Sequence, residues 1–185
     1  MADIYFFSGP CGCGKSTLVD AFAKDIVNNK GKRQVYVIHG DTFHQGFVEA
    51  DNKESFFVNG EAANAFEWKE ILSFNWECIL ETAAKALKRG IDVIIDYVVE
   101  ERLPLLMKLA VENIADLYYV VLTASEEKIV SRITERGDVD MIERALFLKN
   151  KLDNMPENQG HLFDNSDLSV EQEIERLNIE DFIIK

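Results

Sequence analysis

One short stretch constrains the fold of this chain more than any other: the pattern G-x-x-x-x-G-K-[ST] runs from Gly9 to Ser16. The apolar run IYFFS at 4–8 predicts a strand before it, and apolar residues at helical spacing follow from Leu18 to Ile26. Glycines let a loop turn its backbone N–H groups toward an anion, and the N-terminus of a helix adds unpaired donors. The stretch therefore predicts an anion-binding loop between a strand and a helix.

The residue types in this loop indicate which anion it binds. A lysine at position 15 can reach β- and γ-phosphates, a hydroxyl at Ser16 suits Mg²⁺, and Thr17 suits the α-phosphate. The loop therefore predicts binding of ATP with Mg²⁺, and a glycine-rich turn without a ligand is the alternative. The predicted nucleotide-binding residues are Gly9, Gly12, Cys13, Gly14, Lys15, Ser16 and Thr17.

The cysteines do not indicate a metal site. Cys11 and Cys13 form a C-x-C pair, but Cys78 is alone, so a second ligand pair is missing. We interpret the pair as part of the loop, and a redox role for it stays open. Three cysteines do not make a disulfide framework, which favours a reducing cytoplasm.

Length and charge exclude several classes of protein. A chain of 185 residues fits a single domain, 1–185. Its net charge of −13, from 33 acidic and 20 basic residues, argues against nucleic acid as a partner, because binding a polyphosphate backbone requires a basic face. No apolar run approaches the roughly 20 residues of a membrane span, so we expect no membrane association.

Short apolar runs alternate with helical patterns along the chain. This alternation predicts an α/β fold with a parallel sheet flanked by helices. Pro104 and the pattern from Ser169 to Gln172 predict two helix starts. Residues 43–76 stand apart because they hold six of the twelve Phe and both Trp. The predicted strands are IYFFS, VYVIHG, IDVIID, LYYVVLT and HLFDNS.

Two predicted strands end in an acid. Asp96 ends IDVIID and Asp41 follows VYVIHG, and strand ends of a parallel sheet share one edge with the phosphate loop. We expect Asp96 to join Ser16 at the metal, and Asp41 to orient a substrate hydroxyl toward the γ-phosphate. A chance acid at a strand end is the alternative for Asp96, and a helix cap before Thr42 is the alternative for Asp41.

Three of the seven arginines lie within a stretch of thirteen residues after the fourth predicted strand. Arg132 and Arg136 are four residues apart and so share a helix face, and Arg144 comes after Gly137, which interrupts the helical pattern. Arginines on such a helical hairpin can close over a transferring phosphoryl group and neutralise its charge. A solvated surface with acidic neighbours is the alternative.

The sequence resembles the P-loop small-molecule kinases, a group with the nucleoside monophosphate, shikimate and gluconate kinases and chloramphenicol phosphotransferase. The motifs that carry the resemblance are GPCGCGKST, the strand-end GD at 40–41, VIIDY, SRITERGD and LFDNSDLSVEQEIERL. It implies a three-layer P-loop fold with a five-stranded parallel sheet in the order 2-3-1-4-5. It also implies a small helical acceptor-site insertion at about 42–75 and a lid at about 125–152 carrying the three arginines, and it puts Asn165, Ser166 and Asp167 near the adenine.

One departure from this group concerns the acceptor. No arginine lies between Arg33 and Arg89, so the arginines that bind the acceptor's carboxylate or phosphate in shikimate and nucleoside monophosphate kinases have no match. The absence of such arginines fits an uncharged hydroxyl compound better than an acceptor with a carboxylate or a phosphate. Aromatic residues could enclose it, or they could form a private core of the insertion. These residues are Phe43, Phe47, Phe56, Phe57, Trp68 and Trp76.

The sequence thus predicts an ATP- and Mg²⁺-dependent kinase that phosphorylates a hydroxyl of a sugar or polyol, nucleoside or antibiotic-like molecule. A nucleotide-binding ATPase or regulator without an acceptor is one rival. A GTPase is the other, because NKLD at 150–153 matches N-K-x-D, but that run ends a helical pattern instead of following a strand. The acceptor and the oligomeric state are not specified by the sequence.

Overall fold

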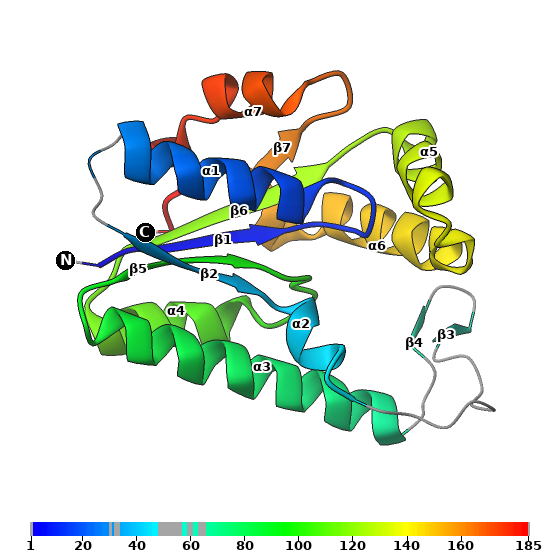
Figure 1. Ribbon diagram of the computed structural model, residues 1–185. Helices are drawn as coiled ribbons and strands as arrows, with labels where there is room; N and C mark the ends of the chain where they lie inside the picture. The colour runs from blue at the N-terminus through cyan, green and yellow to red at the C-terminus, as the bar shows by residue number, and fades with distance from the viewer. Residues whose placement is uncertain are drawn as a thin grey trace.

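The computed structural model describes residues 2–29, 31, 34–47, 57–58, 61–62 and 66–184. Its centre is a five-stranded sheet in the order β2-β5-β1-β6-β7, with every neighbouring pair parallel (Figure 1). Numbered along the chain within this sheet, the order is 2-3-1-4-5, so the predicted topology is confirmed. The strands are β1 (Ile4–Ser8), β2 (Val35–His39), β5 (Asp92–Asp96), β6 (Leu117–Thr123) and β7 (Leu162–Asp164).

Helices cover both faces of this sheet, which gives the three layers that were expected. Helices α1 and α7 lie on one face, and α3 and α4 lie on the other (Figure 1). Helices α5 and α6 lie beyond the carboxyl ends of the strands. The helices are α1 (Lys15–Asn29), α2 (Asp41–His44), α3 (Phe66–Leu87), α4 (Leu103–Asn113), α5 (Glu126–Arg136), α6 (Ile142–Asn154) and α7 (Val170–Arg176). Short 3₁₀ helices are η1 (Val139–Met141), η2 (Pro156–Asn158) and η3 (Ile179–Phe182).

The central strands are buried on both sides, as their continuous apolar runs predict. In β1, Ile4 and Phe6 pack under α3 and α4, whereas Tyr5 and Phe7 pack under α1 and α7. Successive side chains of a strand point to opposite faces, so one apolar run supplies two cores. This burial fixes the register of the strands, and with it the position of every residue at their carboxyl ends.

Local signals set several helix ends as predicted. The Ser169 side chain accepts a hydrogen bond from the Gln172 N–H and the Gln172 side chain accepts one in return, so α7 begins with a capping box. Pro104 lies in the first turn of α4. Helix α5 begins at the Ser125 cap and ends at Gly137, whose φ of +83° is a left-handed conformation that suits glycine.

The insertion expected at about 42–75 is described in part. It contains most of α2, the antiparallel pair of β3 (Phe57–Val58) and β4 (Glu61–Ala62), and the start of α3. The rings of Phe47 and Phe74 meet edge to face, with their centroids 5.2 Å apart. The prediction for Phe56 and for the side chains of Phe57 and Trp68 lies outside the described residues.

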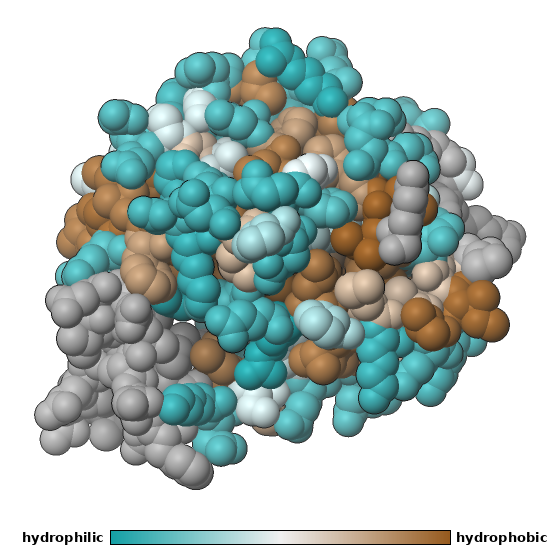
Figure 2. Space-filling view, turned by 180° about the vertical axis from the view of Figure 1, so that it is seen from behind, coloured by the Kyte–Doolittle hydropathy of each residue, from teal (hydrophilic) through white to brown (hydrophobic). Residues whose placement is uncertain are grey.

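The surface carries both polar and apolar side chains. Seen from behind, hydrophilic side chains cover much of it and hydrophobic patches interrupt them (Figure 2). None of the helices among the described residues combines the length and the apolar character needed to span a bilayer.

Candidate active site

The predicted phosphate loop joins β1 to α1 and is shaped by its glycines. Gly9 and Gly12 have φ angles of +141° and +77°, which residues other than glycine rarely adopt. A Cβ on Gly9 would lie 2.5 Å from the Leu122 carbonyl oxygen, and one on Gly12 would lie 2.8 Å from Ile133 Cγ1. The loop is thus packed against β6 and α5, and the space at these two positions is available to glycine alone.

Lys15 stands at the N-terminus of α1 and turns back over the loop. Its Nζ donates to the carbonyl oxygens of Gly9 and Pro10, both at 2.9 Å. The ammonium group therefore lies beside the loop, at the place where the N–H groups of the helix start are unpaired. Fixed positive charge and free donors together favour a bound anion.

Ser16 and Asp96 meet where β1 and β5 end, as the sequence predicts. The Ser16 hydroxyl donates to Asp96 Oδ2 at 2.5 Å, and Asp96 is buried. A hydroxyl and a carboxylate are the hard oxygen ligands that Mg²⁺ prefers, and Mg²⁺ commonly uses one or two protein groups with phosphates and waters. These two side chains therefore fit a magnesium ion next to the loop.

His39 joins this pair and was missed by the sequence analysis. Its Nδ1 is 2.8 Å from Asp96 Oδ1, and its Nε2 is 3.4 Å from Asp20 Oδ1. His39 is paired in register with Asp96 across β2 and β5. Its position next to the end of the predicted strand VYVIHG was the available signal, because strand ends meet at one edge of a parallel sheet.

A single cavity of about 470 Å³ lies over the loop at the carboxyl edge of the sheet. Asp41 lines it together with Lys15 and Ser16, so the structure brings the predicted acceptor carboxylate to the predicted phosphate site. Asp41 is the first residue of α2 and Gly40 is the N-cap, so Asp41 does not occupy the capping position of this helix. The other lining residues come from the loop, α3, the segment after β5, and the 136–151 region.

The three predicted arginines take different positions. Arg136 and Arg144 line the cavity. Arg136 lies 3.1 Å from both Cys11 Sγ and Asp138 Oδ2, and Arg144 is buried in an ion pair with Glu100. Arg132 does not line the cavity.

Instead of facing the cavity, Arg132 Nη1 lies 3.4 and 3.3 Å from the carbonyl oxygens of Gly12 and Cys13 and 3.4 Å from Asn165 Oδ1. The i,i+4 spacing of Arg132 and Arg136 put both on one helix face. It could not show that the first would reach the loop while the second would reach the cavity.

The segment after β5 contributes site residues that the sequence analysis did not identify. Tyr97, Glu100, Glu101 and Arg102 line the cavity directly after Asp96. Glu100 accepts from Lys151 at 2.9 Å in addition to Arg144, so this segment is tied to α6. Residues that directly follow a parallel strand lie at the same edge of the sheet as the last residue of that strand. Their position after Asp96 was therefore the signal that could have identified them.

Comparison with known proteins identifies the family of this chain. Residues 6–151 match a family model described as an AAA domain, which is well over half of the chain. The chain belongs to this AAA domain family. No curated protein sequence matches it.

Solved structures similar to this AAA domain include three kinases. The Mycobacterium tuberculosis APS kinase CysC, in complex with AMPPNP and APS, has a TM-score of 0.65 and 16% identity, with 94% of each chain covered. A sugar kinase from Janibacter sp. HTCC2649 has a TM-score of 0.61 and 18% identity, covering 98% of this chain and 96% of that one. A gluconokinase from Sinorhizobium meliloti 1021 has a TM-score of 0.54 and 16% identity, covering 98% and 89%. At these identities the likeness shows that the AAA domain has a P-loop kinase fold.

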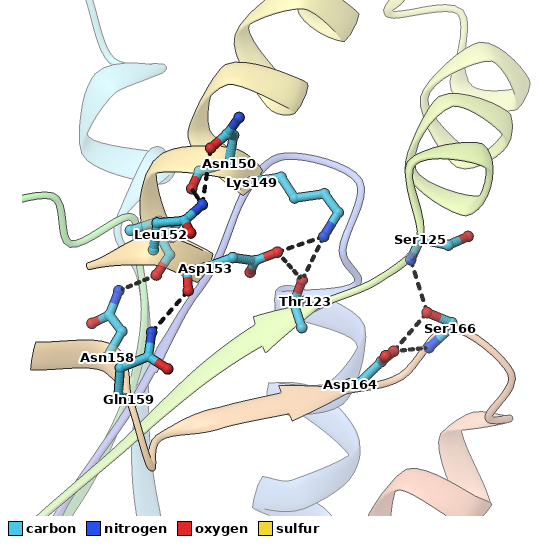
Figure 3. Close-up of polar contacts among 11 residues, drawn as sticks. Thr123, Ser125, Lys149, Asn150, Leu152, Asp153, Asn158, Gln159, Asp164 and Ser166 are labelled. Atoms are coloured by element: carbon cyan, nitrogen blue, oxygen red, sulfur yellow. Dashed lines mark hydrogen bonds and ion pairs between the residues drawn. The ribbon is translucent and has the colours of Figure 1, made fainter. Parts of the chain in front are cut away.

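In this AAA domain the loop expected near the adenine supports the phosphate loop. Asn165 is buried, and its Nδ2 donates to the Cys13 carbonyl at 2.8 Å and to Glu173 Oε1 at 3.1 Å. The Ser166 hydroxyl accepts from the Ser125 N–H at 2.8 Å, which joins this loop to the start of α5 (Figure 3). Burial raises the pKa of Glu173, and the hydrogen bond from Asn165 opposes that rise.

The NKLD run of the AAA domain is helical. Residues 150–153 lie within α6, and Asp153 Oδ2 lies 2.5 Å from Lys149 Nζ and 3.2 Å from Thr123 Oγ1 (Figure 3). The pattern that guanine-binding switches use follows a strand. The run therefore connects α6 to the end of β6. It matches the guanine-binding pattern in sequence but not in structural context.

Proposed function

We propose that this protein is an ATP- and Mg²⁺-dependent kinase that transfers the γ-phosphoryl group to a hydroxyl of a small molecule. The observation that carries the proposal is the shared cavity: the phosphate loop, Asp41 and two lid arginines all line it. A nucleotide site alone would not need a carboxylate from the neighbouring strand end. The similar structures are kinases, one of them in complex with AMPPNP, and they support the same class.

The donor side of the proposed site consists of the loop, Lys15 and Ser16. The backbone N–H groups and the Lys15 ammonium bind the triphosphate of ATP, which is a substrate. Ser16 and Asp96 would hold Mg²⁺, and His39 fixes the Asp96 carboxylate by their 2.8 Å contact. When bound, Mg²⁺ supplies positive charge against the β- and γ-phosphates.

On the acceptor side, Asp41 orients the substrate hydroxyl and takes its proton. The hydroxyl oxygen forms a bond to the γ-phosphorus while the bond from that phosphorus to the β–γ bridging oxygen breaks. ADP leaves with the electron pair of that bond. The Asp41 proton then passes to solvent, since Asp41 is exposed.

Arg136 and Arg144 are the lid residues that we assign to the transferring phosphoryl group. Positive charge aimed at that group stabilises the transition state more than the ground state, because charge develops there during transfer. Arg132 holds the loop in place by its contacts with the Gly12 and Cys13 carbonyls. We therefore assign Arg132 to positioning of the donor site.

Some expectations remain proposals. We propose that the chain acts as one domain, 1–185, with the acceptor insertion at about 42–75 and the lid at about 125–152. We also propose a cytoplasmic protein without nucleic-acid partners. The net charge of −13 and the three free cysteines support these two statements.

The test is a screen of sugars, polyols, nucleosides and hydroxyl-bearing antibiotics for accelerated ADP release. Lys15→Ala should lower kcat/KM with the best acceptor about a hundredfold to a thousandfold, because it removes a charge that faces the phosphates. Lys24→Ala is the matched control, since Lys24 is exposed on the same helix.

Two outcomes would contradict the proposal. Equal turnover by the Lys15→Ala and Lys24→Ala variants would remove Lys15 from the donor site. ATP binding with slow hydrolysis that no hydroxyl compound accelerates would favour the ATPase or regulator.

A further inference from the structure

The cavity is basic although the protein is acidic. Among the described residues that line it, six side chains are cationic and three are acidic. The whole chain has a net charge of −13. The cavity therefore concentrates positive charge locally, which favours anions inside it over the outer surface. The cations are Lys15, Lys69, Arg102, Arg136, Arg144 and Lys151.

Four of these cations bind groups of the loop or the lid. Lys15 donates to loop carbonyls, Arg136 faces Asp138, and Arg144 and Lys151 both bind Glu100. These contacts hold the loop and the lid in place. The four cations therefore belong to the part of the cavity where we propose that the nucleotide binds.

Arg102 differs from those four cations. It is half-buried at the start of α4, and no carboxylate among the described residues forms an ion pair with it. Its neighbours Glu100 and Glu101 are both bound to Lys151. The Arg102 guanidinium instead lies over Trp76, 5.9 Å from the ring centroid. An aromatic ring orients a guanidinium without neutralising it, so its five N–H donors stay available for an anion.

Tyr97 links Arg102 to the acceptor carboxylate. Its ring is buried and packs edge to face on Trp76, with centroids 5.5 Å apart, and its hydroxyl accepts from Asn75 at 3.0 Å. Burial raises the pKa of Tyr97; the Asp41 charge adds to this rise and the Arg102 charge opposes it. Asp41, Tyr97 and Arg102 line the same cavity, so one small molecule bound there can contact both charged groups.

We propose that the phosphoryl acceptor carries an oxyanion group, a carboxylate or a phosphate ester, and that Arg102 binds it while Asp41 receives the hydroxyl. This inference rests on the proposed kinase function and names its substrate class. It reverses the expectation of an uncharged acceptor. That expectation counted arginines between 33 and 89, whereas Arg102 reaches the acceptor side from the segment after β5. A guanidinium is suited to such a group because it can donate two parallel hydrogen bonds to it.

A binding experiment tests the anion site without turnover. Malonate, a dicarboxylate, is titrated into Trp68→Phe protein saturated with ADP and Mg²⁺, and the fluorescence of the remaining Trp76 is followed. We expect a saturable change with malonate and none with its neutral diamide.

Arg102→Gln should raise the malonate Kd about tenfold or more, whereas Arg102→Lys should recover part of the affinity. Arg89→Gln, an exposed arginine at the end of α3, should change nothing. Equal titrations of the Trp68→Phe protein with and without Arg102→Gln would overturn the proposal, as would the absence of a saturable change.

A turnover experiment tests the same point in catalysis. Matched pairs of acceptors, such as glycerate with glycerol and gluconate with glucose, are compared for ADP release. We expect the anionic member to be preferred, and Arg102→Gln to raise its KM about tenfold while the KM for ATP stays constant. Preference for neutral members, with no effect of Arg102→Gln, would reject the anion site and leave the kinase standing. Malonate binding that needs Arg102, without any accelerating hydroxyl compound, would reject the kinase and support the anion site.

Discussion

At the scale of single residues, Asp41 separates the proposed kinase from a simple nucleotide-binding protein. It comes from the end of β2 and yet lines the same cavity as the loop after β1. It is the first residue inside α2, whose N-cap is Gly40, so its carboxylate does not occupy the capping position of that helix. A carboxylate that lines the cavity can accept a proton from a hydroxyl that faces the γ-phosphate.

Asp41→Asn should lower kcat about a hundredfold or more, because the amide cannot take the proton, and should leave the ATP affinity within about twofold. Turnover kinetics and calorimetry with an ATP analogue measure the two quantities. Asp116→Asn, at an exposed position before β6, serves as the control. A large loss of thermal stability in Asp41→Asn would instead show that this carboxylate is structural.

At the scale of elements, the lid is fastened to the sheet by one cluster of charges. Glu100 after β5 binds both Arg144 and Lys151 on α6. The Arg144 side chain is 8% exposed and that of Glu100 is 31% exposed, so solvent screens this pair incompletely. The same cluster keeps Arg144 at the wall of the cavity, which ties the position of a proposed catalytic group to the packing of α6.

Glu100→Gln should lower the free energy of unfolding by about 2 kcal/mol, or Tm by about 4–8 °C, because it removes the negative charge that faces the buried Arg144 guanidinium. Thermal unfolding followed by circular dichroism measures this. Glu101→Gln is the matched control, since the Glu101 side chain is 79% exposed and lies 3.4 Å from the same Lys151. A Tm equal to that of the control would show that the cluster does not hold the lid.

The same pair predicts a pH dependence. Burial raises the pKa of Glu100, but the hydrogen bond from Lys151 and the charge of Arg144 outweigh it and hold the pKa below its ordinary value. A lowered folded-state pKa stabilises the protein above the unfolded pKa, and this contribution is lost as the pH falls through the folded pKa. The Tm gap between wild type and Glu100→Gln should therefore be largest near pH 7 and narrow below about pH 4. A gap that stays constant with pH would contradict this.

At the scale of the whole molecule, the proposed nucleotide site gathers segments from most of the chain. The loop after β1 contacts Arg132 of α5 and Asn165 after β7, and Asn165 contacts Glu173 of α7. A ligand that binds only when these parts are assembled stabilises the complete fold, since binding to the native state alone shifts the unfolding equilibrium.

ADP with Mg²⁺ at about a hundred times its Kd should therefore raise the free energy of unfolding by about 2.7 kcal/mol, or Tm by about 5–10 °C. Differential scanning fluorimetry measures the shift. Lys15→Ala should lose most of it at the same ligand concentration, and Lys24→Ala should keep it. Equal shifts in the two variants would show that ADP binds elsewhere.

The sequence by itself determined the fold class, the strand order through its resemblance to the P-loop kinases, and the loop with Lys15 and Ser16. These features depend on local spacing and periodicity, which a linear pattern displays directly. It also paired Asp96 with Ser16, because parallel strand ends share one edge. Tertiary structure alone decided that Arg132 supports the loop and that His39 contacts Asp96. It likewise decided that Arg102 lines the cavity. The contacts of His39 and Arg132 join residues 57 to 120 positions apart, and only the packing of the folded chain sets which of them form.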